Sequence, residues 1–110
     1  MEALTELSDI ARHQEVEAVF RSLVQEWKSR RGHSSCVEDM VIDLAYQKII
    51  GLGPEAIPLL LAELDREPDH WFWALFAITR HDPVPEGSRG KIEKMAAAWI
   101  EWGKQRGYRW

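Results

Sequence analysis

Apolar residues recur every three or four positions along most of this chain, which is the spacing of amphipathic helices. The first predicted helix covers residues 9–31, where Phe20 and Trp27 belong to the apolar stripe. A second helical pattern covers residues 36–50. Its β-branched residues and Asp43 allow a break near position 43, which would divide it into two short helices.

Residues 49–79, IIGLGPEAIPLLLAELDREPDHWFWALFAIT, are expected to form the middle of the fold. A Gly-Pro turn leads into a predicted helix over residues 54–66, and an acidic connection leads into another over residues 71–79. Because this last helix is apolar on every side, we expect neighbouring elements to surround it.

A Pro-rich connection over residues 80–88 precedes a final predicted helix at about 89–105. Strand-like alternation of useful length does not occur in the sequence. The pattern therefore predicts an all-α fold, a compact bundle of about five helices. The 110 residues fit a single domain, 1–110.

The amino-acid composition indicates the cellular compartment of the protein but says little about what reaction or binding it performs. Cys36 is the only cysteine, so an intramolecular disulfide is impossible and a reducing cytosol is expected. The N-terminus lacks the basic and apolar regions of a secretory leader, and the apolar runs are too short to span a bilayer. We expect a cytoplasmic protein without a membrane partner.

The charge is unevenly distributed. Residues 1–79 carry seven Lys/Arg against fourteen Asp/Glu, whereas residues 80–110 carry seven against four, and the whole chain has a net charge of −4. A negative chain argues against bulk binding of nucleic acid. The basic C-terminal third either marks an interaction tail or complements the dipole of the last helix.

Motifs for metal or catalytic chemistry are weak. His33 and Cys36 have a ligand-like spacing, but a structural zinc site needs four ligands, so no metal and no cofactor is expected. Cys36 near a helix start could act as a nucleophile, although nothing in the sequence orients a histidine towards it. Gly51 and Gly53 lack the lysine and further glycines of a phosphate-binding loop.

The end of the fourth predicted helix offers a better candidate binding site. An Arg, a His and an Asp are expected there near tryptophan edges and beside a stiff loop, an arrangement suited to binding a peptide or an anion. The candidate residues are His70, Trp73, Arg80, His81 and Asp82. The alternative is structural: Asp82 begins the turn before the next proline, and Arg80 caps the helix carbonyls.

The C-terminal tail, Tyr108, Arg109 and Trp110, is the other candidate. Aromatic and basic residues alternate here and in the preceding helix, as on surfaces that stack bases or bind a protein. Trp99 and Trp102 are instead expected to anchor the core. Two aromatic rings at a chain end are costly to leave in water, so we expect the tail to pack back on the domain or against another chain.

The stretch IIGLGPEAIPLLLAEL resembles one unit of a HEAT-type α-hairpin: a helix, a Gly-containing turn, and a helix that opens acidic-Ala-aliphatic-Pro-Leu-Leu. The resemblance covers roughly residues 45–67 and implies one HEAT-like hairpin within the bundle. HEAT units usually serve as scaffolds that bind proteins or nucleic acids. Residues 46–108, with WFWAL, DPVP and WIEWG, also resemble small bacterial proteins of uncharacterised function, which implies no activity.

Three functions follow in order of expectation. The first is a small cytosolic helical module that binds a protein partner or a second copy of itself. The second is a nucleic-acid-associated regulatory protein that uses the basic C-terminal third. The third is a small enzyme or toxin-like protein that uses His81 and Asp82, or Cys36.

Overall fold

The computed structural model describes residues 2–31 and 37–110, and within these ranges the regular structure is entirely helical. The predicted all-α bundle is confirmed. Its α-helices are α1 (Glu2–Arg31), α2 (Val37–Ile42), α3 (Leu44–Gly51), α4 (Ala56–Arg66), α5 (Phe72–Thr79) and α6 (Ile92–Gln105), with short 3₁₀ helices at Gly53–Glu55 and Glu86–Ser88. His33 and Cys36 lie outside the described residues.

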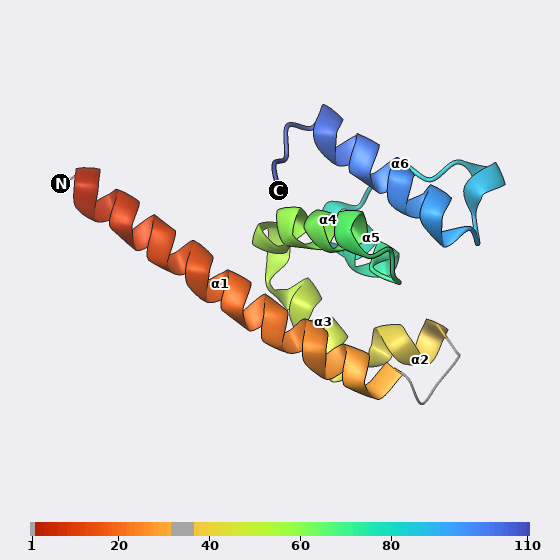
Figure 1. Cartoon of the computed structure of the whole chain (residues 1–110), viewed down its shortest axis with the longest axis horizontal. Helices are drawn as coiled ribbons and strands as arrows, with labels where there is room; N and C mark the ends of the chain where they lie inside the picture. Colours follow the sequence, from red (N-terminus) through yellow and green to blue (C-terminus); the bar gives the residue numbers. More distant parts are fainter. Residues whose placement is uncertain (1, 32–36) are drawn as a thin grey trace.

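Helix α1 is longer than the body that it packs against. It begins at Glu2 rather than at residue 9, and Figure 1 shows its N-terminal half extending away from the other helices. Its buried residues, Phe20, Leu23, Val24 and Trp27, all lie in the C-terminal half. Only that half of α1 therefore contributes to the core among the residues whose burial is described.

The predicted break near position 43 is confirmed, and Asp43 is its cause. The carboxylate of Asp43 accepts a hydrogen bond from the backbone N–H of Ala45 at 2.8 Å, which caps the start of α3. It also accepts two hydrogen bonds from the guanidinium of Arg30, each 2.7 Å long. These bonds hold the pKa of Asp43 below its ordinary value and join α3 to the end of α1.

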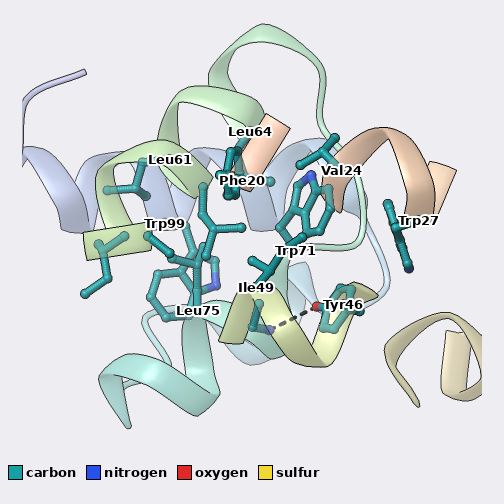
Figure 2. Packing of buried hydrophobic residues seen from close by; sticks show 14 of the residues in the cluster. Phe20, Val24, Trp27, Tyr46, Ile49, Leu61, Leu64, Trp71, Leu75 and Trp99 are labelled. Atoms are coloured by element: carbon teal, nitrogen blue, oxygen red, sulfur yellow. Dashed lines mark hydrogen bonds between the residues drawn. The ribbon is translucent and has the colours of Figure 1, made fainter. Parts of the chain in front are cut away.

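Three aromatic rings contact one another within the core, and Figure 2 shows Trp71 among them in the middle of the buried side chains. The rings of Tyr46 and Trp71 stack at a centroid distance of 5.5 Å, and the ring of Trp27 lies 4.4 Å from that of Trp71. All three side chains are completely buried. The Tyr46 hydroxyl donates to the carbonyl of His70 at 2.9 Å and accepts from the backbone N–H of Ala74 at 3.0 Å. A side chain of α3 thus satisfies a free N–H in the first turn of α5.

The expectation that other elements surround α5 is wrong. Ala74 and Leu75 are buried, but Trp73 is 51% exposed and Phe76 is 42% exposed. The uncovered face follows from the packing, because α5 rests on α3 and α4, whereas α6 packs mainly against α4. An apolar sequence on all sides of a helix does not determine which sides its neighbours cover.

Candidate functional site

The uncovered face of α5 forms an aromatic surface with two adjoining hollows. Phe72, Trp73 and Met95 line both hollows, and Phe76 lies beside Trp73 with a ring-centroid distance of 5.6 Å. We call these four residues the α5 surface. The first hollow has a volume of about 240 Å³ and the second a volume of about 410 Å³. Trp73 therefore stands between the two hollows, and a side chain of a partner could pack on either side of it.

Polar groups occupy the edges of the α5 surface. Asp82 and Arg89 line the smaller hollow and form an ion pair of 2.6 Å, which lowers the pKa of Asp82. The other oxygen of Asp82 accepts from the backbone N–H of Val84 at 3.2 Å, so the predicted role of Asp82 in starting the turn is confirmed. His70 lines the larger hollow. An apolar centre with a polar edge is the usual composition of a protein-binding surface.

Arg80 ends α5 in a left-handed conformation, with φ of 60°. Its backbone N–H donates to the carbonyl of Phe76 at 2.7 Å, so the main chain of Arg80 provides the predicted cap. The side chain is exposed and lines neither hollow of the α5 surface. Arg80 is therefore placed as a structural residue of the helix end.

His81 lies on a different face from Asp82. Its ring is 5.9 Å from that of Trp102, in a separate hollow of about 330 Å³ that Tyr108 and Arg106 also line. The five residues predicted as one site are therefore divided: Trp73 shares one hollow with His70 and the other with Asp82, and His81 belongs elsewhere. The enzyme alternative that used His81 and Asp82 therefore has no support from a shared hollow, and the one that used Cys36 lies outside the described residues.

The C-terminal tail packs back on the domain, as predicted. The indole N–H of Trp110 donates to the carboxylate of Asp65 in α4 at 3.0 Å, and the ring of Tyr108 stacks on that of Trp102 at 5.8 Å. Trp99 is buried, as expected for a core anchor. The faces by which Tyr108 and Trp102 stack are not available to bases, whereas Trp110 is 39% exposed, so the nucleic-acid alternative stays a prediction.

The tail also forms one wall of a larger groove, of about 680 Å³, that the sequence did not predict. The other walls come from α1 and from the segment that includes α4. Most of its lining is apolar. The residues that contribute are His13, Val16, Glu17, Phe20, Arg21, Pro54, Glu55, Pro58, Leu59, Ala62, Glu63, Tyr108, Arg109 and Trp110. The available signal was the apolar stripe of α1, which continues to Val16, beyond the residues that become buried.

No protein-family model, curated protein or solved structure matches this chain. Across the described ranges, no helix has both the length and the apolarity needed to cross a membrane. Within the same ranges, His, Cys, Asp and Glu do not gather in groups of three that could hold a metal ion.

Proposed function

We propose that this protein is a small cytosolic helical module that binds another protein through the α5 surface. The observation that carries the proposal is the exposure of Trp73 and Phe76 on a helix that has no polar face. Single exposed apolar residues are common on soluble proteins, but adjacent aromatic rings beside hollows are typical of interaction sites.

The energy available from covering this surface is considerable. Half of a Trp and nearly half of a Phe side chain expose together roughly 200 Å² of apolar area, whose burial is worth about 5 kcal/mol. Association itself costs about 4–15 kcal/mol in lost freedom of motion. A stable partner must therefore also contact Phe72, Met95 and the polar edge.

The composition of the α5 surface favours a protein over a small molecule. Tryptophan, phenylalanine, methionine and arginine are the residues enriched at protein interfaces. Arg89 stands at the edge of the surface, and its ion pair with Asp82 fixes the orientation of the guanidinium. A partner that contacts this guanidinium would therefore not have to neutralise an unpaired charge. The resemblance of residues 45–67 to a HEAT-type hairpin adds support, because HEAT units usually serve as binding scaffolds.

Site-specific photocross-linking in the native host tests the proposal. A benzoylphenylalanine at position 76 should give discrete cross-linked protein species, which disappear when Trp73→Ser is added. Because Trp73 is half-exposed, this substitution should leave the helical circular dichroism and the melting temperature nearly unchanged.

The matched control places the same cross-linker at Gln25, an exposed position of α1. Equal yields at positions 25 and 76, or species at position 76 that persist with Trp73→Ser, would refute binding through the α5 surface.

A further inference from the structure

The α5 surface is small for an interface between two folded proteins. Trp73 and Phe76 together expose roughly 200 Å² of apolar area, and Phe72 and Met95 beside them are half-buried. A stable complex of two folded proteins buries about 800 Å² on each partner. The area therefore suits a short segment of a partner better than the face of a second domain or of a second copy of this chain.

The ring of Trp73 divides the two hollows. Val84 and Trp99 belong to the lining of the smaller hollow, and Val41 and Ile92 to the lining of the larger one. A segment that fills both hollows must carry two apolar groups with a gap between them for Trp73. In a polyproline II helix, the extended helix of proline-rich segments, residues three positions apart lie on the same side and about 9 Å apart. This spacing leaves such a gap.

The indole N–H of Trp73 restricts the backbone that can cover it. This N–H makes no hydrogen bond within the described part of the chain. Covering the ring removes the donor from water, so the occupant should supply an acceptor. The backbone carbonyls of an α-helix are bonded within the helix, whereas those of a polyproline II helix are free. An extended segment can therefore satisfy the donor with its backbone, and an amphipathic helix cannot.

The charged groups at the edge of the α5 surface are already paired. Arg89 forms ion pairs with Asp82 at 2.6 Å and with Glu86 at 3.3 Å. Apart from Arg89 and Asp82, no Asp, Glu, Lys or Arg among the described residues lines either hollow. A charged segment would find no unpaired group of opposite sign there, so the charges favour an uncharged occupant.

The chain itself places a proline-containing segment beside the smaller hollow. Residues 82–85, Asp-Pro-Val-Pro, lie outside the helices, and Pro85 has φ of −64° and ψ of 151°, close to the angles of a polyproline II helix. Val84, in the middle of this segment, is buried and lines the smaller hollow together with Trp99. An extended backbone with prolines thus already packs at one edge of the α5 surface.

We propose that the α5 surface binds a short, uncharged, proline-rich segment of its partner in the polyproline II conformation. Two apolar residues of the segment occupy the hollows on the two sides of Trp73, and a backbone carbonyl between them accepts from the indole N–H. Proline rings fix the backbone before binding, so little conformational freedom is lost, which suits a surface of limited area. This inference rests on the proposed function and specifies the partner of the same site.

Fluorescence anisotropy with a labelled peptide of ten prolines tests the inference on the full-length protein. The expected dissociation constant is about 0.1 mM and no weaker than about 1 mM. A Gly-Ser peptide of the same length and label should bind at least about tenfold more weakly, because its backbone is flexible and carries no apolar rings. Since the proline peptide is uncharged, raising the salt from about 50 to 500 mM should change its dissociation constant less than about twofold.

Trp73→Phe and Trp110→Phe form a matched pair of variants. Trp73→Phe keeps an aromatic ring and removes the N–H donor, so it should weaken binding of the proline peptide about three- to tenfold. Trp110 is 39% exposed but lines neither hollow and donates its N–H to Asp65, so Trp110→Phe should change binding less than about twofold. Equal effects of the two variants, or equal binding of the proline and Gly-Ser peptides, would overturn the inference.

The cross-links at position 76 separate this inference from the proposed function. Mass spectrometry of the trapped partner should place the cross-link within a segment that contains at least two prolines. If Trp73-dependent cross-links map to a segment without proline, or the proline peptide fails to bind at about 1 mM, the class of segment is wrong while binding through the α5 surface stands. If Trp73-dependent cross-links do not form, the proposed function and this inference are both refuted.

Discussion

The substitution Gly103→Ala tests how closely α6, α4 and the tail are packed. Gly103 is buried in α6, and a Cβ atom built on it would lie 2.6 Å from Cδ1 of Leu61. It would also lie 3.2–3.3 Å from two ring atoms of Trp110. Two opposite effects must be compared, because alanine is the better helix former but brings a methyl group into an occupied space.

The packing effect is expected to be the larger of the two. Replacing glycine by alanine inside a helix gains at most about 1 kcal/mol, and less near the helix end. Leu61 is completely buried, so it can move only by displacing other core residues, and such overpacking costs about 1–3 kcal/mol. Gly103→Ala should therefore lower the free energy of unfolding by about 1 kcal/mol. This corresponds to a fall in Tm of about 4–8 °C.

Urea unfolding followed by tryptophan fluorescence and by circular dichroism measures this difference. Gly51→Ala provides the matched control, because Gly51 lies at the end of α3 and its added Cβ would have no atom within 4 Å. This control should be neutral or stabilising. If Gly103→Ala stabilised the protein as much as Gly51→Ala does, the close packing of α6 on Leu61 would be refuted.

Three further substitutions test individual interactions. Trp71→Phe should lower the free energy of unfolding by about 1–2 kcal/mol less than Trp27→Phe does. The reason is that the indole N–H of Trp71 has no partner among the described residues, whereas the indole N–H of Trp27 donates to a backbone carbonyl. Equal losses of stability in urea unfolding would contradict this. Arg80→Gly should raise the unfolding free energy by about 0.5–1 kcal/mol by relieving a positive φ, and a lower Tm would refute the gain. Arg30 holds the pKa of Asp43 in the folded chain below its ordinary value of 3.8, so the unfolded chain binds the proton more readily. The Arg30–Asp43 pair therefore stabilises the fold fully above pH 3.8, and this stabilisation is lost as the pH falls through the lower pKa of the folded state. When the free energy of unfolding is measured against pH in the acid range, Asp43→Asn should make it fall less steeply with decreasing pH. An unchanged dependence on pH would contradict the stabilising role of the Arg30–Asp43 pair.

Local patterns predicted the helices well because their causes are local. The break at Asp43 depends on a polar side chain that caps the next helix, and such a residue is visible in the sequence. The return of the tail follows from the cost of leaving both aromatic rings, Tyr108 and Trp110, fully in water, and in the folded chain Tyr108 is half-buried against Trp102. Both predictions needed no knowledge of which helices are neighbours.

The candidate site was harder to predict because it depends on neighbours and on backbone direction. The apolar circumference of α5 could not reveal that Trp73 would remain exposed, since coverage depends on where α6 packs. Arg80 adopts a left-handed conformation that redirects the chain, and the following His81 and Asp82 then lie in different hollows. Adjacent positions in sequence were therefore poor evidence for a shared site.

The hydroxyl of Tyr46, between the carbonyl of His70 and the N–H of Ala74, has a consequence for how this protein can be divided. Helix α5 has eight residues, too few to persist alone in water, and its first turn is completed by a side chain from α3. A fragment that begins after α3 would retain every residue of the α5 surface and lose its shape. During synthesis, the exposed face of α5 can take its shape only after both α3 and α5 have emerged and packed together.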